Sequence, residues 1–469
     1  MCGIAGYASG NHVDLTSAID VLLSLLVELQ HRGQEATGIV LLTKNGEFRQ
    51  LHARSLVSNL LFKTDVIREK SEEVFAVLGH VRYSTTGGYW DSVVQPIIVG
   101  DDDFKVALAF NGTIPNHKRV MEQVCGIECH GKNVKSDTES LALSLYHVAR
   151  EFKKDVVEGL KELSRYIIGG YSVLVATSEP RIIIARDPWG FRPLAYALEG
   201  DELYIASETG ALTTLGITNW REVEPGEIIS YDGKSIERTS FPVKREPAPC
   251  IFEYVYFSRP DSVFNGISVY NARYRMGEIL GREFPVEGDI VVPVPDSARI
   301  AALGYSRATG IPIAEALIAN KYIGRVFINP PITRLKLAVL KYGVVQDIVA
   351  GKRVVLIDDS IVRGTTMKYL ISKIRKSGAR KIHVRISSPP FKCPCFMGID
   401  VASRLELAVW RARGIDDIRR EIGADSLNYN TLDGLVKAVG LSRVCHACFS
   451  CSYPFNGVTM EELEEMVRR

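Results

Sequence analysis

Residues 354–366 constrain the fold of this chain more than any other stretch, and they read V-V-L-I-D-D-S-I-V-R-G-T-T. The first four residues are apolar and mostly β-branched, which is typical of a strand buried on both faces of a parallel sheet. Apolar residues then recur at helical spacing, at positions 367, 370, 371 and 374. A glycine at 378 marks the expected helix end, and Lys381–Ile386 reads as a second strand. The segment therefore predicts a βαβ unit with a ligand outside the strand ends.

The loop after the first of these strands has the chemistry of a phosphate site. Backbone N–H groups of residues 361–366, next to a helix N-terminus, can bind a phosphate. Asp358 and Asp359 directly precede them, and adjacent carboxylates can accept sugar hydroxyls and ligate Mg²⁺. A nucleotide P-loop is not indicated, because Gly364 is followed by Thr365 instead of lysine. A surface turn would explain the two aspartates alone, but not thirteen positions in this order.

Length and composition place the chain among globular proteins of more than one domain. It has 469 residues, of which 46% are apolar and 24% charged. The formal charge of +2 gives no reason to expect nucleic acid or an anionic membrane as partner. The most apolar early run, residues 21–29, is too short to span a bilayer and reads as a core helix. We therefore expect a cytoplasmic protein.

The chain begins M-C-G-I-A-G-Y, which places a cysteine directly after the initiator methionine. Removal of Met1 would make Cys2 the first residue, with a nucleophilic thiolate and its own α-amine as general base. The alternative is a small buried cysteine at the start of a strand. The amine mechanism leaves His31 and His80 no necessary role, so we interpret both as structural.

Five further motifs follow the Cys2 segment in order. They are H-R-G-Q-E at 31–35, H-V-R-Y-S-T-T-G at 80–87, N-G at 111–112, S-D-T-E at 136–139 and R-D-P-W-G-F-R-P-L at 186–194. Together with the first residues, they resemble the glutamine amidotransferase domain of the N-terminal-nucleophile hydrolases, over about residues 2–235. The resemblance implies an αββα sandwich with Cys2 as the nucleophile.

The same resemblance assigns roles to single positions. Arg82 matches the cation that binds the α-carboxylate of glutamine, and Asp137 matches the anion that binds its α-ammonium. The Asn111 side chain and the Gly112 N–H match an oxyanion hole, and Arg32 matches a glutamine-site position near the nucleophile. Taken singly, Arg82 and Asp137 also fit surface charges, and Asn-Gly is the commonest hairpin turn; the joint pattern favours the site.

A second domain follows a proline-rich connector, which we place at residues 236–252. An apolar strand at 289–293 is followed by V-P-D-S-A-R at 294–299. This loop and residues 354–366 resemble the pyrophosphate and 5-phosphoribosyl-1-pyrophosphate (PRPP) loops of type I phosphoribosyltransferases. The resemblance implies a doubly wound α/β domain over 253–445, followed by a cysteine-containing segment and helix at 446–469.

The resemblance also supplies the residues of the PRPP site. Ser297 matches a Mg²⁺-associated position, and Mg²⁺ is implied on Ser297, Asp358 and Asp359. PRPP contacts are implied at Lys336, Asp358, Asp359, Ser360, Ile361, Val362, Arg363, Gly364, Thr365 and Thr366. The stretch after Lys336 is a few residues longer than the bacterial pattern.

A Cys2 glutaminase followed by a PRPP domain is similar to the family of glutamine PRPP amidotransferases. The resemblance implies the first step of de novo purine biosynthesis, from glutamine, PRPP and water to 5-phosphoribosylamine, glutamate and pyrophosphate. It also implies a homotetramer inhibited by purine nucleotides. Glucosamine-phosphate synthase and asparagine synthetase share the first motifs but lack the D-D-S-I-V-R-G-T-T loop. A PRPP-binding regulator without catalysis would not need the intact glutaminase motifs.

Nine cysteines, several of them clustered, suggest metal or redox chemistry more than a disulfide framework. Residues 445–451 contain C-x₂-C-x₂-C, and zinc and iron–sulfur clusters both accept four thiolates, so spacing alone does not choose. The iron–sulfur subgroup of the family implies a [4Fe–4S] cluster on Cys250, Cys395, Cys445 and Cys448. Cys393 and Cys451 depart from that pattern and are interpreted as spare or substitute ligands. Unliganded buried thiols are the alternative.

Overall fold

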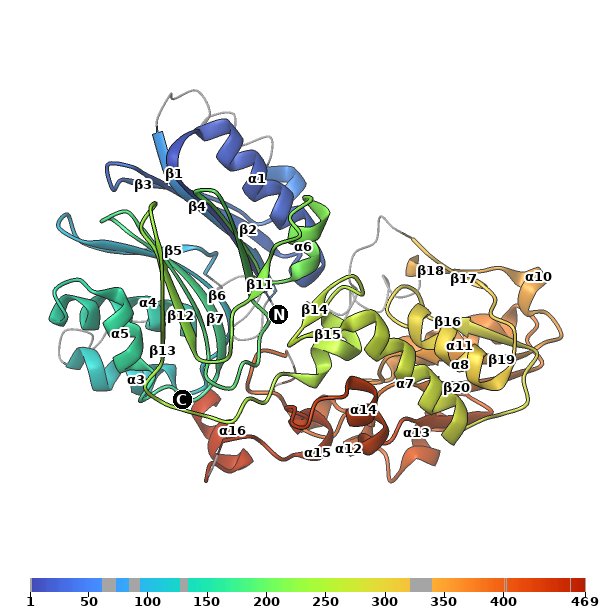
Figure 1. Cartoon of the computed structure of the whole chain (residues 1–469). Helices are drawn as coiled ribbons and strands as arrows, with labels where there is room; N and C mark the ends of the chain where they lie inside the picture. The colour runs from blue at the N-terminus through green and yellow to red at the C-terminus, as the bar shows by residue number, and fades with distance from the viewer. Residues whose placement is uncertain are drawn as a thin grey trace.

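Two antiparallel sheets build the first half of the chain, and a parallel sheet organises the second (Figure 1). The computed structural model describes residues 2–60, 73–83, 93–126, 134–320, 340–399, 401, 403–455 and 457–468. Among these residues, no helix is long and apolar enough to cross a membrane.

The first sheet has seven strands in the order β11-β9-β10-β1-β4-β2-β3. Every neighbouring pair is antiparallel, and the outer face is covered by α1 and α6. Leucines and isoleucines recur at helical spacing on α1, which explains why one face of this helix is buried. The elements are β1 (Gly3–Asp14), α1 (Leu15–Glu28), the short helix η1 (Gln30–Arg32), β2 (Ala36–Thr43), β3 (Phe48–Ala53), β4 (Glu73–Arg82), β9 (Ala195–Glu199), β10 (Glu202–Ala206), α6 (Thr209–Thr214) and β11 (Arg221–Glu222).

The second sheet has six strands in the order β13-β12-β8-β7-β6-β5, and α3, α4 and α5 cover its outer face. Its edge strand β13 consists of residues that the sequence assigned to the connector, so this sheet continues past residue 235. The elements are β5 (Ile97–Gly100), β6 (Lys105–Thr113), α3 (His117–Cys125), α4 (Asp137–Glu151), α5 (Val156–Leu163), β7 (Gly170–Thr177), β8 (Arg181–Arg186), β12 (Glu227–Tyr231) and β13 (Ile236–Ser240).

The two sheets pack face to face through a shared apolar core. Alternate residues of β1 and β2, such as Ile4 and Val40, meet alternate residues of β6 and β7, such as Ala109 and Leu174. The period-2 alternation of strands leaves the opposite faces for the helices. The expected αββα sandwich is confirmed.

The second half is organised around the parallel strands β16, β19, β20 and β21. A parallel bridge between Val291 and Ile313 adds a fifth chain segment beside β16, which gives the strand order 2-1-3-4-5. Right-handed crossovers that run in opposite directions from β16 put α8 and α11 on opposite faces, as in doubly wound sheets. The expected fold class is confirmed. The main elements are α7 (Val269–Glu283), β16 (Ile290–Pro293), α8 (Arg299–Thr309), β19 (Arg353–Asp358), α11 (Thr365–Lys376), β20 (Lys381–Ile386), α13 (Ile415–Ile422), β21 (Ser426–Tyr429) and α14 (Leu432–Val439).

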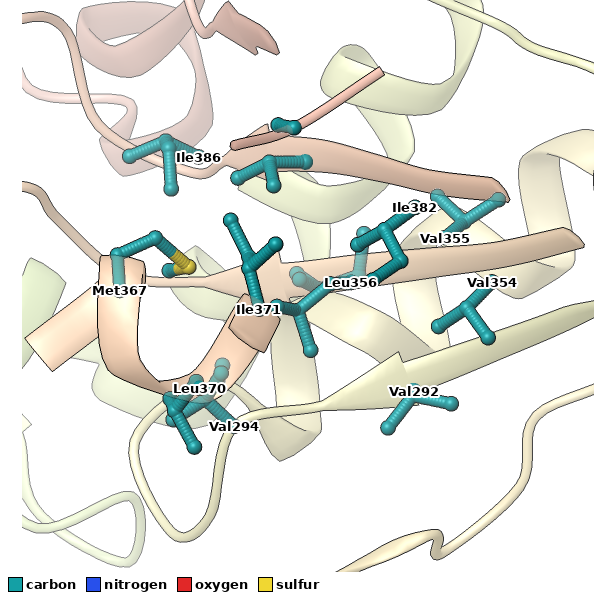
Figure 2. Packing of buried hydrophobic residues seen from close by; sticks show 14 of the residues in the cluster. Val292, Val294, Val354, Val355, Leu356, Met367, Leu370, Ile371, Ile382 and Ile386 are labelled. Carbon is teal, nitrogen blue, oxygen red and sulfur yellow. The ribbon is translucent and has the colours of Figure 1, made fainter. Parts of the chain in front are cut away.

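The predicted βαβ unit forms as expected from its apolar pattern. Met367, Leu370 and Ile371 on α11 pack against the strands, where Leu356 and Ile382 are fully buried (Figure 2). This packing fixes the start of α11 relative to the end of β19. The remaining elements are the π-helix η3 (Glu253–Phe257), β14 (Val263–Phe264), β15 (Ile267–Ser268), β17 (Leu317–Ala319), β18 (Tyr342–Val344), α10 (Gln346–Val349), η5 (Arg404–Glu406), α12 (Ala408–Arg411), α15 (Ala447–Ser450) and α16 (Met460–Arg468).

The C-terminal segment returns to the first half of the chain (Figure 1). Phe455 lies in edge contact with Trp189, with ring centroids 5.1 Å apart, and also packs on Phe191. Leu463 of α16 belongs to the same apolar cluster. The two halves are therefore joined by the connector and by the chain's end.

Candidate active sites

Cys2 lies at the start of β1, beside the end of β4 and the strand β6. Its backbone N–H donates to Oδ1 of Asn111 over 3.3 Å, and its Sγ lies 3.5 Å from the carbonyl oxygen of Tyr83. The side chain of Cys2 is partly exposed. The thiol is therefore accessible to a ligand and is not packed in an apolar interior.

Asn111 supplies what an oxyanion hole needs. Its side chain is fully buried, and its Nδ2 has no hydrogen-bond partner among the described residues. A buried N–H without an acceptor costs about 1–3 kcal/mol, so this donor suits a ligand that brings an oxygen. Gly112 follows on β6, and a Cβ there would lie 2.1 Å from the carbonyl oxygen of Gly170. The strand pairing itself therefore requires glycine at this position.

Asp137 is the first residue of α4, and it is held by backbone groups. Its Oδ2 accepts from the Ile114 N–H over 3.2 Å, and its Oδ1 accepts from the Thr138 N–H over 2.8 Å. Burial raises the pKa of Asp137 to about 6, against these hydrogen bonds. A buried carboxyl of this kind suits an incoming cation such as an α-ammonium group.

The two arginines expected at the glutamine site have different surroundings. Arg82 ends β4, is largely buried, and has its NH1 3.3 Å from Oε2 of Glu35. Arg32 is fully buried, and its Nε donates to the carbonyl oxygen of Cys2 over 2.9 Å. The remaining nitrogens of Arg32 donate to Glu208 and Glu253. The structure thus places Arg32 on the main chain of the nucleophile, with its guanidinium fully engaged.

The second site lies where the strand order reverses, between β16 and β19. Asp358 ends β19, and Oγ of Ser297, which follows β16, donates to Oδ1 of Asp359 over 2.6 Å. Burial, and then the like charge of Asp359, raise the pKa of Asp358 well above its usual value. Burial also raises the pKa of Asp359. Adjacent carboxyls with raised pKa values in an oxygen-rich pocket suit a divalent cation.

The loop after Asp359 is contacted by residues 406–408, a segment that the sequence did not indicate. Gly364 has φ of 80°, a left-handed conformation that favours glycine, and α11 begins at the next residue. Arg363 donates from Nε to Glu406 over 2.8 Å, and the Ala408 N–H donates to the Val362 carbonyl over 2.8 Å. The loop therefore has backbone N–H groups near a helix N-terminus, as predicted.

A cavity of about 420 Å³ extends from the PRPP loop to residues that neighbour Cys2. Its lining includes His31, Arg32 and Tyr83 near Cys2, and Ser297 near the aspartates. Its volume is in the usual range for small-molecule sites. The cavity is also lined by these residues of the predicted PRPP site: Asp358, Asp359, Ser360, Ile361, Val362, Arg363, Gly364, Thr365 and Thr366. Lys336 lies outside the described residues.

Comparisons with known proteins match this arrangement. Residues 80–214 match the family model described as "Glutamine amidotransferase domain". The amidophosphoribosyltransferase of Pyrococcus horikoshii is 46% identical over 92% of this chain and 92% of its own length. That of Methanocaldococcus jannaschii is 40% identical over 97% and 98%. The solved glutamine PRPP amidotransferase from B. subtilis, complexed with ADP and GMP, superimposes with a TM-score of 0.84 at 36% identity, covering 98% of this chain and 100% of that one.

The chain belongs to the amidophosphoribosyltransferase family. Its activity is therefore the glutamine-dependent amination of PRPP, the first step of purine biosynthesis. The rival synthases considered from the sequence are set aside by these full-length matches.

The cysteines of this amidophosphoribosyltransferase separate into two groups. Cys393 and Cys451 form a disulfide, so they are not substitute ligands for a cluster in this structure. The other four cysteines of the region remain free thiols: Cys250, Cys395, Cys445 and Cys448. These four are the positions for which the family resemblance implied a [4Fe–4S] cluster.

The four free thiols lie close together and are mostly buried. The main chains of Cys250 and Cys445 run side by side, with the Ile251 N–H donating to the Cys445 carbonyl over 3.1 Å. Burial raises the pKa of Cys250 to about 11 and also raises the pKa values of Cys445 and Cys448. Like charge from the neighbouring thiols adds to each shift. Buried thiols of this kind suit a metal cluster that takes them as thiolates.

Within the described ranges, no three His, Cys, Asp or Glu side chains are arranged to hold a metal ion. A [4Fe–4S] cube is wider than one ion, so its thiolates do not converge on one point. Arg192 lies nearby, and the charges of Cys250 and Cys395 favour its protonated form. A cation close to Cys250 and Cys395 suits the negative charge of such a cluster, and the donor set therefore fits it.

Sequence reasoning missed several residues that complete these sites. Glu253 and Glu208 hold Arg32 from two sides, and Arg192 shares Glu253 with it. Glu406 holds the PRPP loop through Arg363. One signal was available for Glu253, because an acidic residue opens the aromatic run E-Y-V-Y-F directly after the connector.

Proposed function

We propose that glutamine is hydrolysed at Cys2 and that its ammonia reacts with PRPP at residues 358–366 of the same chain. The observation that carries the proposal is a cavity that is lined by residues 358–366 and reaches Arg32 and Tyr83, which both contact Cys2. Ammonia held inside the protein would be kept from protonation by bulk water, so such a cavity favours transfer over release. Products would be 5-phosphoribosylamine, glutamate and pyrophosphate.

The first half-reaction uses groups at the start of β1 and on β6. Removal of Met1 frees the Cys2 amine, which takes the thiol proton as Sγ attacks the amide carbon of glutamine. The Asn111 Nδ2 and the Gly112 N–H donate to the oxyanion that forms. The C–N bond then breaks, the proton passes to the leaving ammonia, and water hydrolyses the thioester to glutamate. Asp137 and Arg82 hold the two ends of the amino acid.

The second half-reaction uses the strand ends of the parallel sheet. Backbone N–H groups of residues 361–366 bind the phosphate of PRPP, and the carboxylates of Asp358 and Asp359 accept its ribose hydroxyls. Ammonia forms a bond to C1 as the bond from C1 to pyrophosphate breaks, and one proton is lost. Mg²⁺ would be held by Ser297, Asp358 and Asp359, and it offsets charge on pyrophosphate when bound.

We also propose a [4Fe–4S] cluster on Cys250, Cys395, Cys445 and Cys448. The support is the burial of these thiols, their mutual proximity and the cation of Arg192 beside them. The cluster would tie the end of the connector to the C-terminal segment, which is a structural role. Iron and sulfide content of anaerobically prepared protein tests this: about four irons per chain are expected, and one zinc per chain would contradict the proposal.

Regulation by purine nucleotides is a further part of the proposal. A solved relative was complexed with ADP and GMP, and another is described as the allosteric regulatory enzyme of purine biosynthesis. We propose that this chain binds such nucleotides as inhibitors and assembles as a homotetramer. Inhibition by ADP and GMP, and the mass of the assembly in solution, test these two points separately.

The proposal as a whole is tested by mixing glutamine, PRPP and Mg²⁺ and measuring glutamate and pyrophosphate together. Equal amounts of both products are expected. Glutamate release without PRPP-dependent pyrophosphate would overturn the proposal. Omitting Mg²⁺ serves as the control for the second site, because glutamate release alone needs no divalent cation.

A further inference from the structure

Four fully buried charged side chains meet between the two halves of the chain. Arg32, Glu208 and Arg192 come from the glutaminase half, and Glu253 comes from η3, beyond the connector. Their side chains are at most 1% exposed. Two cations and two anions balance within this group, which we call the interface charge cluster. Burying ion pairs of this kind costs desolvation free energy, so stability alone does not explain their presence here.

Glu253 is the centre of the interface charge cluster. Its Oε1 accepts from Arg32 over 2.9 Å and from Arg192 over 3.2 Å. Its Oε2 accepts from Arg32 over 3.2 Å and from Oγ of Ser258 over 2.8 Å. Glu253 thus receives Arg32 through two parallel hydrogen bonds, the geometry that fixes both the position and the plane of a guanidinium group.

The fixed guanidinium acts directly on the nucleophile. Arg32 donates from Nε to the carbonyl oxygen of Cys2 over 2.9 Å, while Glu208 takes another of its N–H groups. Because the guanidinium is rigid and planar, holding its two terminal nitrogens also sets the direction of Nε. The backbone of Cys2 is therefore positioned by a carboxylate from the other half of the chain.

The same carboxylate is connected to the thiol group at Cys395. Arg192 donates from Nε to the Met397 carbonyl over 2.7 Å, and the Met397 N–H donates to Sγ of Cys395 over 3.4 Å. An unbroken series of polar contacts therefore runs from Cys395 through Arg192, Glu253 and Arg32 to Cys2. The Cys2 nucleophile and the free thiol of Cys395 are therefore connected by polar contacts.

We propose that Glu253 is a positioning residue for glutamine hydrolysis, which sets the Cys2 nucleophile through Arg32. This inference rests on the proposed role of Cys2. Glu253 is fully buried and does not line the cavity, so its effect should fall on the thiol chemistry and not on the reaction at PRPP. Misplacement of a nucleophile by about 1 Å is enough to lower the rate about 100-fold.

The test compares Glu253→Gln with a matched control, Glu222→Gln. Glu222 crosses the same interface, where it accepts from the N–H groups of Asn265 and Gly266 over 2.6 and 2.7 Å, without contact to Arg32. Three rates are measured: glutamate release, ammonium-dependent pyrophosphate release, and inactivation by 6-diazo-5-oxo-L-norleucine, a glutamine-like reagent that alkylates the nucleophilic thiol. Glu253→Asp is made in parallel, because it keeps the charge and remains informative if the glutamine variant does not fold.

Glu253→Gln should lower glutamate release and inactivation about 100-fold, with ammonium-dependent pyrophosphate release unchanged within about twofold. Glu253→Asp should lower the first two rates about tenfold, and Glu222→Gln should change none. Glutamate release at the wild-type rate in both Glu253 variants would overturn the proposal. Equal loss of the glutamine and ammonium reactions would also overturn it, because that pattern indicates a merely structural role. Cys2→Ser separates a failure of the positioning role from a failure of the proposed function. Persisting glutamate release in that variant would contradict the proposed function itself.

Discussion

The two reaction sites of this protein differ in how far their own side chains complete them. Around Cys2, the polar groups are positioned by strands and a helix start, with Asn111 and Asp137 each held by backbone contacts. At the PRPP loop, two adjacent carboxyls face one another, and burial and like charge raise the pKa of Asp358. The first site has its donors and acceptors in place, whereas the second holds two carboxyls whose ionised forms a bound cation would favour.

This difference assigns different chemistry to the two halves. A thioester route needs a nucleophile, a base and oxyanion donors, and the first site has a residue for each. Displacement of pyrophosphate concentrates negative charge on a leaving group, and the second site offers oxygen ligands for a cation that offsets it. The proposed mechanism therefore uses protein groups around Cys2, and Mg²⁺ held by the two aspartates at the PRPP loop.

The largest effect is expected from Cys2→Ser. Loss of the thiol should lower glutamate release by at least about 10⁴-fold, as removal of a nucleophile does in other covalent mechanisms. Pyrophosphate release driven by high ammonium should remain, because ammonia then bypasses the first site. The two products are measured in parallel. If the folded variant loses both activities, the sites are not separate and the comparison fails.

The converse change is Asp358→Asn or Asp359→Asn. Each should lower pyrophosphate release about 10³-fold, since several kcal/mol of charge stabilisation would be lost with the metal. Glutamate release without PRPP should change little. Asp425→Asn is the control, because this carboxylate precedes β21 and pairs with Arg375. Retention of full pyrophosphate release in both variants would contradict the role of the two aspartates.

Removing the disulfide tests whether this link to the C-terminal segment contributes only to stability and not to either reaction. Replacing Cys393 and Cys451 by serine should lower the free energy of unfolding by about 2–4 kcal/mol, because the bridge closes a long loop. Denaturant unfolding, with and without a thiol reductant, measures the change. Both reaction rates should stay at the wild-type level. A loss of bound iron in the double variant would mean that these cysteines act on the cluster as well.

The smallest effect concerns the pH dependence of glutamine binding. The pKa of Asp137 is about 6, so its ionised fraction falls from about 90% at pH 7 to about 10% at pH 5. Because the α-ammonium of glutamine binds the ionised form, KM for glutamine should rise about tenfold over this range. Asp137→Asn should raise KM at pH 7 and remove the pH dependence. A KM that does not change between pH 5 and 7 in the wild type would contradict this role.

The sequence predicted most of the fold, whereas the roles of the site residues stay predictions. The βαβ unit that begins with residues 354–366 could be predicted, because an apolar strand, a loop and an amphipathic helix are local patterns. Cys2, Asn111 and Asp137 were predicted differently, from the joint order of several short motifs that resembles a known family. The structure places Cys2 and Asn111 in contact across more than one hundred residues.

The parts that the sequence did not predict are contacts between distant segments. Glu253 meets Arg32 and Arg192 in space, and no periodicity or spacing connects these three residues. The pairing of Cys393 with Cys451 was likewise not predicted, since connectivity depends on which chain segments the fold brings together. The edge strand β13 was assigned to the connector, and its residues are mostly polar and partly exposed, as at many sheet edges.

The central claim is that nitrogen passes from glutamine to PRPP inside one chain, and the most direct measurement follows that atom. The enzyme is given amide-¹⁵N glutamine and PRPP in an excess of unlabelled ammonium that supports a slow ammonium reaction, and the product is trapped by borohydride. The account predicts that the trapped 5-phosphoribosylamine carries ¹⁵N. Product nitrogen that matches the isotopic composition of the bulk ammonium would contradict it.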